Sequence, residues 1–137
     1  MTPAPNDRSD ITAPADIRLL VDTFYSDLRR DAMLGPIFNG KIGDDWSHHT
    51  PKIYAFWEAV LLGATGYTGN PMLTHIQLDR EFSLTDAHFV HWLTKWDATV
   101  DALFTGEKAE EAKKKARMMA GLMMFKIGAA KSPGFIQ

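Results

Sequence analysis

The amino-acid sequence predicts an all-α fold, because apolar side chains recur with the spacing of helices and no segment shows the alternation typical of a strand. The length of 137 residues suits one domain. Short connections between the predicted helices favour antiparallel neighbours. We expect a flexible N-terminal tail at 1–11, one helical domain at 12–128 and a C-terminal tail at 129–137.

The first predicted helix begins after Thr12, which can serve as its N-cap, and has Pro14 in its first turn. Its apolar residues follow a helical period: Ile17, Leu20, Val21, Phe24 and Leu28. Tyr25 lies at the edge of the apolar face that they form.

The segment after this helix is expected to be irregular. A charged turn at 29–31 ends the helix, and Pro36, which follows a glycine, prevents its continuation. We therefore expect Ile37 and Phe38 to lie in a connection.

The second predicted helix begins near Pro51, a residue suited to a first helical turn. Its apolar residues again repeat at helical spacing: Ile53, Phe56, Trp57, Val60 and Leu61. His49 lies on the same stripe, whereas His48 points about 100° away. The glycine-rich segment 63–69 is predicted to be a loop, and its spacing fits neither a P-loop nor a dinucleotide fingerprint.

A short helix is predicted from Pro71 to about Leu78, with His75 on the same face as Met72. A single histidine on an apolar face is more often a structural residue than a ligand. The spacing of His75 alone therefore leaves both interpretations open.

Two long helices complete the predicted domain. One begins near Thr85 and has a single apolar face: Phe89, Trp92, Leu93, Trp96, Val100 and Leu103. Gly106 separates it from the last helix, which we expect at about 107–127. The inner face of that last helix consists mainly of small and flexible residues: Ala112, Ala116, Met119, Ala120, Met123 and Ile127.

The composition excludes several classes of function. The chain has no cysteine, so disulfides, thiolate metal sites and cysteine nucleophiles are ruled out. A formal charge of −2 gives no reason to expect nucleic acid as a partner. There is no basic-then-apolar signal sequence and no apolar run long enough for a membrane span. We expect a cytoplasmic protein without a membrane partner.

Few kinds of catalytic site are compatible with these residues. No serine occupies a nucleophile-elbow context, and the Glu-x-x-His pairs of a di-iron bundle are missing. His88 and His91 have the spacing of a zinc pair, with Glu81 or Asp86 as further ligands, but two solvated histidines explain them more simply.

Haem is the cofactor that the remaining residues can serve. It requires one neutral imidazole, a partner for the other imidazole nitrogen and a wide apolar slot. His75 can provide the imidazole, and carbonyl groups near Pro71 and Met72 can accept its Nδ1–H. Aromatic residues are numerous enough to form the walls of the slot, since the chain has eight Phe and four Trp.

The sequence resembles the truncated haemoglobins, most closely their third group. The matching blocks are FYSDLRRDAMLGPIF at 24–38, WSHHTPKIYAFWEAVLLG at 46–63, YTGNPMLTH at 67–75 and HFVHWL at 88–93. Their order and spacing match over roughly residues 14–125.

The resemblance implies a globin-like, two-over-two helical sandwich around haem b, iron protoporphyrin IX. His75 matches the proximal iron ligand, and three residues match the distal positions that stabilise a bound ligand: Tyr25, His49 and Trp92. The expected cofactor-binding residues are Phe38, Lys52, Ile53, Trp57, Met72 and Arg80. Lys52 and Arg80 are the candidates for contacts with the haem propionates.

The expected ligands are dioxygen, nitric oxide and carbon monoxide, bound at the iron and held tightly by the polar distal side. We expect oxygen, nitric oxide or peroxide chemistry with an unidentified reductase, in place of bulk oxygen delivery. Other interpretations remain open: a haem-dependent peroxidase-like or nitric-oxide-detoxifying enzyme, a haem sensor or transfer protein, and a haem-free helical interaction domain.

Overall fold

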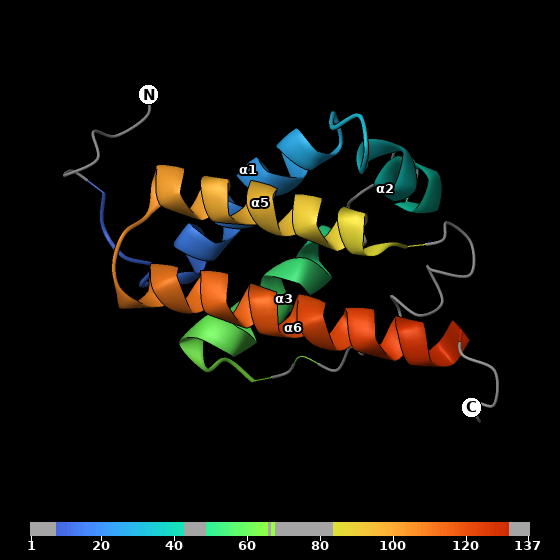
Figure 1. Ribbon diagram of the computed structural model, residues 1–137. Helices are drawn as coiled ribbons and strands as arrows, with labels where there is room; N and C mark the ends of the chain where they lie inside the picture. The colour runs from blue at the N-terminus through green and yellow to red at the C-terminus, as the bar shows by residue number, and fades with distance from the viewer. Residues whose placement is uncertain (1–7, 43–48, 66, 68–83, 132–137) are drawn as a thin grey trace.

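The computed structural model describes residues 8–42, 49–65, 67 and 84–131. Within these residues the chain forms helices and no strand, so the predicted all-α fold is confirmed (Figure 1). The helices of the described residues are α1 (Pro14–Leu28), α2 (Gly35–Ile42), α3 (Thr50–Leu62), α5 (Asp86–Leu103) and α6 (Glu107–Lys131). None of them is both long and apolar enough to cross a membrane.

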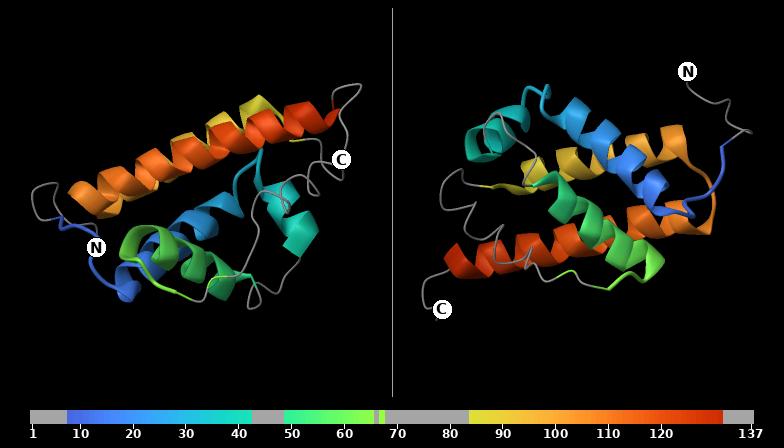
Figure 2. Two further views of the ribbon diagram at one scale, coloured as in Figure 1. Left: turned by 90° about the horizontal axis from the view of Figure 1, so that it is seen from below. Right: turned by 180° about the vertical axis from the view of Figure 1, so that it is seen from behind.

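The helices form two layers, each made of one pair. Helices α5 and α6 lie side by side and antiparallel, joined by a tight turn, and α1 and α3 form the pair behind them (Figure 2). Contacts between the layers join α1 to α5 and α3 to α6. This arrangement places the inner faces of all four long helices around one core.

The core combines large side chains from α1, α3 and α5 with mainly alanines from α6. The buried apolar residues are, in chain order, Ile11, Ile17, Leu20, Val21, Phe24, Leu28, Leu34, Ile37, Trp57, Leu61, Leu84, Phe89, Trp96, Val100, Phe104, Ala109, Ala112, Ala116, Ala120, Met123 and Ile127. The alanines let bulky rings from α5 approach the α6 backbone. Trp96 shows this directly, because its Nε1–H donates to the Ala112 carbonyl oxygen at 3.1 Å.

The start of α1 differs in detail from the sequence prediction. The N-cap position is Ala13 and not Thr12, with Pro14 in the first turn as expected. The Asp16 carboxylate compensates for the missing cap side chain, because its Oδ2 accepts from the backbone N–H of Thr12 at 2.9 Å and of Ala13 at 3.1 Å. An acidic residue in the first turn also interacts favourably with the helix dipole.

The prediction that Ile37 and Phe38 lie in an irregular connection was wrong, since both belong to α2. Pro36 ends the preceding segment, but it is also acceptable in the first turn of a new helix, where its missing N–H has no helical partner. The Asp31 carboxylate helps to start α2, because its Oδ2 accepts from the N–H of Leu34 at 2.8 Å and of Met33 at 3.0 Å.

Gly35 is required by the close packing of this turn. A Cβ at that position would lie 2.7 Å from the carbonyl oxygen of Arg29, which belongs to the backbone and cannot rotate away. The chain therefore reverses from α1 into α2 with almost no space between them.

The last residues of the expected N-terminal tail contact the start of α6. The Asp10 carboxylate accepts from the N–H of Lys108 and of Ala109, both at 2.9 Å, and so caps that helix. Ile11 beside it is only 1% exposed. Gly106 has φ 133°, and a Cβ there would lie within 2.8 Å of the Asp10 side chain. Residues 10 and 11 thus pack with the helical domain.

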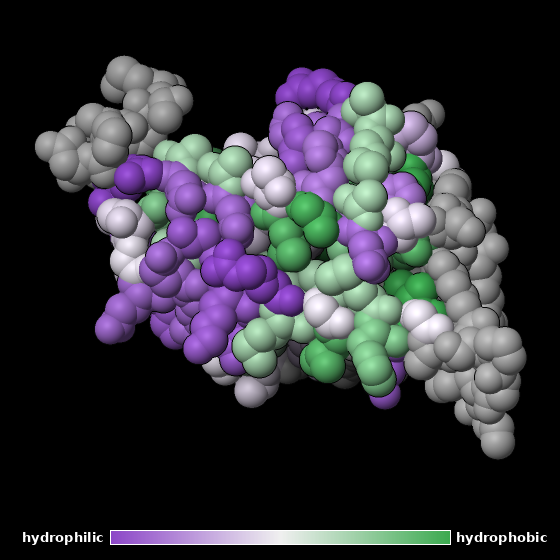
Figure 3. Space-filling view, in the orientation of Figure 1, coloured by the Kyte–Doolittle hydropathy of each residue, from purple (hydrophilic) through white to green (hydrophobic). Residues whose placement is uncertain are grey.

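The outer face of the α5–α6 pair has two distinct parts (Figure 3). Charged side chains gather near the turn between the two helices. Farther along, apolar side chains are exposed on α6, where Met118, Leu122 and Phe125 have exposed fractions between 52% and 70%. Helix α6 also continues to Lys131, past the expected end near residue 127.

Candidate functional site

An aromatic cluster joins the inner faces of α1, α2 and α5. The Phe24 ring meets Tyr25 edge-on at a centroid distance of 4.9 Å and Trp92 at 5.3 Å. Tyr25 in turn meets Phe38 of α2 at 5.8 Å. Edge-to-face contacts of this kind hold the rings in defined orientations. Three predicted site residues, Tyr25, Phe38 and Trp92, therefore lie together in one cluster.

Two polar groups are held inside this cluster. Burial raises the pKa of the Tyr25 phenol, and a side-chain hydrogen bond with Trp92 offsets part of that rise. Indole Nε1–H is only a donor, so Trp92 donates to the phenol oxygen. The phenol stays protonated at any physiological pH, because its pKa lies above its ordinary value. The site thus contains two neutral hydrogen-bond donors in apolar surroundings.

Helix α3 presents its predicted site residues in two directions. Trp57 is 2% exposed, and Ile53, one turn before it, is partly buried against the core. His49 and Lys52 are exposed. His49 occupies the N-cap position of α3, where its carbonyl oxygen accepts from the N–H of Lys52 and of Ile53, each at 3.1 Å. The structure therefore places Ile53 and Trp57 inward and the other two outward.

A cleft of about 570 Å³ leads to Tyr25 from the surface. It opens between α1 and the first turns of α2 and α3. Its lining is largely polar and charged: Val21, Asp22, Tyr25, Ser26, Arg29, Arg30, Asn39 and Thr50. Tyr25 therefore lies between this cleft and the aromatic cluster.

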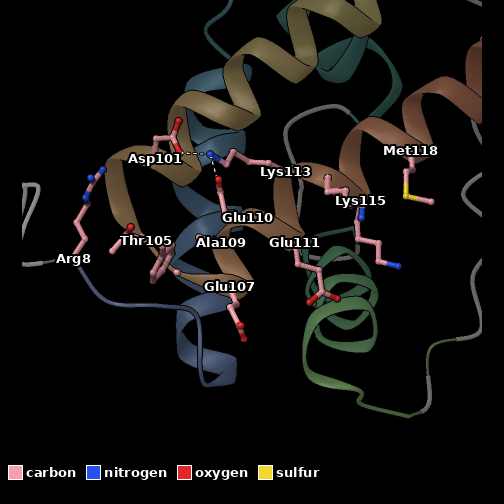
Figure 4. Close-up of a pocket in the computed structure, with 13 residues that line it drawn as sticks. Arg8, Asp101, Thr105, Glu107, Ala109, Glu110, Glu111, Lys113, Lys115 and Met118 are labelled. Atoms are coloured by element: carbon pink, nitrogen blue, oxygen red, sulfur yellow. Dashed lines mark hydrogen bonds and ion pairs between the residues drawn. The ribbon is translucent and has the colours of Figure 1, made fainter.

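A larger cleft, of about 1210 Å³, lies at the turn between α5 and α6 (Figure 4). Charged groups such as Arg8, Asp101 and Lys113 line it, and none of the predicted site residues does. It is open and lacks the apolar walls of a cofactor pocket. The larger cleft therefore lies away from the predicted site residues.

A group of charged residues fixes the aromatic cluster from outside. Asp31 Oδ1 contacts His91 Nε2 at 2.8 Å and Lys95 Nζ at 3.4 Å, and so ties the turn before α2 to α5. Burial alone would raise the pKa of Asp31, but the hydrogen bonds from His91, Leu34 and Met33 outweigh burial and hold the pKa at about 2. Since His91 directly precedes Trp92, its hydrogen bond with Asp31 orients the helix turn that carries the indole.

The two histidines considered for zinc have other partners. His88 Nδ1 accepts from the N–H of Thr85 at 2.9 Å, at the N-cap of α5. His91 is bound to Asp31, as described above. Among the residues that the structure describes, no three His, Cys, Asp or Glu side chains are grouped as metal ligands.

Three predicted site residues, Met72, His75 and Arg80, lie outside the described residues. The axial ligand therefore stays a prediction. Trp96 also contacts the aromatic cluster through Phe24, and Asp31 contacts His91 beside it, but neither was predicted as a site residue. Trp96 had been placed on the correct helix face, whereas Asp31 was seen only as one charge in a polar turn.

The described helices and the aromatic cluster with its two buried donors are those of a globin-like helical protein. The chain is 32% identical over 118 residues to the group 3 truncated haemoglobin ctb of Campylobacter jejuni, and the match covers 82% of this chain and 91% of the relative. The crystal structure of a group III truncated haemoglobin from Campylobacter jejuni is similar with a TM-score of 0.80 and 28% identity, over 88% of this chain and 94% of the other. No family model matches the sequence.

The identity and the coverage show the family. The chain belongs to the group 3 truncated haemoglobins, which are haem-binding globins. The predicted two-over-two fold is confirmed with it.

Proposed function

We propose that this globin holds haem b, with His75 as the iron ligand and with Tyr25 and Trp92 on the opposite side of the ring. When bound, the haem supplies an iron that takes dioxygen, nitric oxide or carbon monoxide. Apolar walls for the ring would come from Phe38, Ile53 and other inward side chains of the cluster.

The donor pair inside the aromatic cluster is the observation that supports this proposal. A buried hydroxyl and a buried indole N–H cost free energy unless each has a partner. Tyr25 and Trp92 satisfy part of this requirement through each other. Such a pair is suited to a small ligand with partial negative charge, because both groups are neutral donors and neither is a base at physiological pH.

The pair acts as a relay. Trp92 donates to the phenol oxygen, and this polarises the phenol O–H and makes it a better donor. A hydrogen bond to a bound ligand in such a pocket contributes about 1 kcal/mol or somewhat more. The phenol donor, strengthened by Trp92, would slow dioxygen release by roughly one to two decades, at about 1.4 kcal/mol per decade. We infer that oxygen is held too tightly for simple delivery.

We propose that His49 acts as a gate to the distal side and does not bind the iron in the resting protein. Its exposed position at the start of α3 supports this assignment. Nearby, Thr50 lines the cleft that leads to Tyr25. A ferric absorption spectrum with a water-ligated, high-spin signature agrees with a gate, whereas a spectrum of two axial imidazoles that disappears in His49→Ala contradicts it.

Lys52 is proposed to reach a haem propionate. It is exposed and directly precedes the partly buried Ile53, so its stem can follow the helix surface to the edge of a bound ring. Arg80 is the second candidate for this contact. Replacement of Lys52 by Met should speed haem transfer to apomyoglobin if the ion pair exists.

The same donors favour redox chemistry as a second candidate function. The hydrogen bond that the Tyr25 phenol would donate, strengthened by Trp92, would polarise a peroxide ligand or orient dioxygen toward nitric oxide. Either reaction requires electrons from a reductase or a small reductant. This use makes the protein a peroxidase-like or nitric-oxide-detoxifying enzyme, with the residue roles unchanged.

The decisive experiment measures absorption spectra of ferric, ferrous and CO-bound protein for the parent and for His75→Ala. A Soret band in the parent that shifts or disappears in the variant supports the proposed ligand. A parent without a Soret band, even after addition of hemin, would support a haem-free interaction domain instead. Rapid transfer of haem to apomyoglobin would favour a sensor or transfer protein.

Tyr25→Phe tests the distal role. We expect dioxygen dissociation to become about tenfold faster, from the loss of about 1.4 kcal/mol. Tyr54→Phe is the matched control, because the Tyr54 hydroxyl bonds to the Asp22 carboxylate on the outer side of α1 and α3. Equal dissociation rates in the parent and in Tyr25→Phe would rule out the phenol as an oxygen-stabilising donor.

A further inference from the structure

Three of the four tryptophans form a continuous stack through the core. Trp92 and Trp96 on α5 are almost parallel, with an interplanar angle of 4° and centroids 5.7 Å apart. Trp96 also stacks on Trp57 of α3, at 19° and 4.6 Å. Phe24 closes one side of the stack, edge-on to Trp96 at 4.9 Å. The indoles thus bridge the two helical layers.

The two ends of this stack lie in different surroundings. Trp92 belongs to the aromatic cluster with the Tyr25 phenol. At the other end Trp57 meets Phe56 at 5.3 Å, and Phe56 meets Tyr67 at another 5.3 Å. Tyr67 is half-buried, so it can exchange a proton or an electron with solvent. The series of rings therefore connects the proposed ligand pocket with a partly exposed tyrosine.

The hydrogen bonds of the stack prevent proton loss from the inner indoles. Trp96 Nε1–H donates to a backbone carbonyl oxygen, and Trp92 donates to a phenol oxygen. Neither acceptor is a base at neutral pH. An indole that gives up one electron here keeps its proton as a cation radical, and the reverse transfer needs no proton to return. Electron exchange between the stacked rings is therefore uncoupled from proton transfer.

The two inner indoles are poor places for a positive charge. Trp96 and Trp57 are almost fully buried, and a charge in such surroundings is strongly disfavoured. A charge that crosses the stack therefore does not stay on them, and the half-buried Tyr67 is where it can stop. A phenol there can release its proton to water when it is oxidised, which traps the charge near the surface.

We propose that Trp92, Trp96 and Trp57 form an electron path that links the haem pocket to Tyr67 and so defines where a small reductant delivers electrons. This rests on the proposed function. Hydrogen peroxide at the pocket takes two electrons and two protons, its oxygen–oxygen bond breaks, and two waters form. Each electron comes from Trp92, is replaced from Trp96 and then from Trp57, and Tyr67 restores Trp57 as it loses a proton to solvent. A one-electron reductant of the ascorbate class, with a proton from solvent, returns Tyr67 to the phenol.

The test uses haem-loaded protein treated with hydrogen peroxide without reductant. Electron paramagnetic resonance identifies the radical, and peptide mass spectrometry locates oxidised side chains. In the parent we expect a tyrosyl signal and oxidation at Tyr67 and Trp57. Trp96→Phe interrupts the series of indoles while a ring still fills the space. Oxidation at Tyr67 and Trp57 should therefore be lost, and oxidation at Trp92 should increase.

Trp57→Phe is the second variant, in case Trp96→Phe does not fold. This substitution should abolish oxidation at Tyr67 and leave oxidation at Trp96 and Trp92. Phe104→Leu is the control for loss of a buried aromatic ring, since Phe104 lies at the turn between α5 and α6. Its oxidation pattern should match that of the parent.

Two results separate failure of the path from failure of the proposed function. A parent protein that takes up no haem overturns the proposed function and the path with it. A haem-loaded Trp96→Phe with an unchanged Soret band and undiminished oxidation at Trp57 and Tyr67 overturns the path alone, and shows the stack to be a packing feature.

Discussion

The two ends of the α5–α6 pair hold their polar groups in different ways. At one end Tyr25 and Trp92 share a hydrogen bond among aromatic rings. At the other, near the turn, Lys113 Nζ contacts Asp101 at 2.7 Å and Glu110 at 2.6 Å, and these two carboxylates are mostly exposed (Figure 4). At the first end the hydrogen bond lies among aromatic rings, with charged side chains such as Asp31 outside them, whereas the second end has its charges in water.

This difference decides how much a polar contact contributes at each end. In apolar surroundings a single donor changes ligand binding by a measurable amount, because little water competes with it. Exposed ion pairs contribute little, because water and salt screen them. We therefore expect substitutions at the aromatic end to have large effects and substitutions at the charged end to have small ones.

Trp96→Ala is expected to have the largest effect on stability. The substitution empties the centre of the stack and removes the bond to the Ala112 carbonyl, so the free energy of unfolding should fall by about 3–5 kcal/mol. Urea denaturation of the haem-loaded protein measures the change. Trp96→Phe should recover part of it, because a ring still fills the space. A loss below about 1 kcal/mol would show that the stack is not the centre of the core.

Asp31→Asn should have the next largest effect, and the effect should depend on pH. The native pKa of about 2 lies below the ordinary value of 3.8, so the ionised carboxylate stabilises the folded state above about pH 4. This stabilisation, about 2 kcal/mol from the size of the shift, is lost as the pH falls toward 2. The variant should be less stable at neutral pH and should show a flatter pH dependence between 4 and 2.

Asp16→Asn is the comparison for this measurement, because Asp16 also accepts backbone N–H groups but has no histidine or lysine partner in the described ion pairs. A pH profile of Asp31→Asn with the same slope as the parent between pH 4 and 2 would show that another carboxylate is responsible.

The sequence predicted the long helices because each has a regular apolar stripe that the core requires. Phe24, Trp57 and Trp96 all lie on predicted faces and are buried. Helix α2 was missed for a physical reason: it is short, and Pro36 both ends one helix and begins the next. A helix of eight residues is too short for a periodic pattern of apolar residues to be recognised.

The candidate site could be predicted only in part. Tyr25, Phe38 and Trp92 were carried over from the family resemblance, and the structure brings them together. The hydrogen bond between Tyr25 and Trp92 depends on how α1 packs against α5. The spacing of residues along the chain gives no information about this packing. The contact of Asp31 with His91 joins positions sixty residues apart and has no signal in local sequence.

Asp10→Ala should have an intermediate effect at the charged end. Burial alone would raise the pKa of Asp10, but backbone hydrogen bonds from Lys108, Ile11 and Ala109 outweigh it, and the pKa is lowered. Loss of this cap should cost about 1 kcal/mol. The stabilisation is present above the ordinary carboxyl pKa and is lost as the pH falls through the lowered one.

Amide hydrogen exchange at Lys108 and Ala109 locates this effect, since both N–H groups lose their acceptor. Asp10→Asn is the comparison. Lys108 and Ala109 donate to different carboxylate oxygens, so the single amide oxygen of asparagine can keep only one of the two bonds, and exchange should rise at the other amide. Unchanged exchange at these two amides in Asp10→Ala would show that the cap does not hold α6.

Lys113→Met is expected to have the smallest effect. The side chain is 15% exposed, whereas Asp101 and Glu110 are 58% and 69% exposed, so their ion pairs lie at the boundary with water. Hydrogen bonds with these carboxylates raise the pKa of Lys113, and methionine keeps the apolar stem while it removes the charge. We expect a loss of at most about 1 kcal/mol, which should shrink as salt is added. Denaturation midpoints at low and high salt measure it. A loss comparable to that of Trp96→Ala would contradict the division between the two ends, because an ion pair in solvent would then contribute as much as the buried stack.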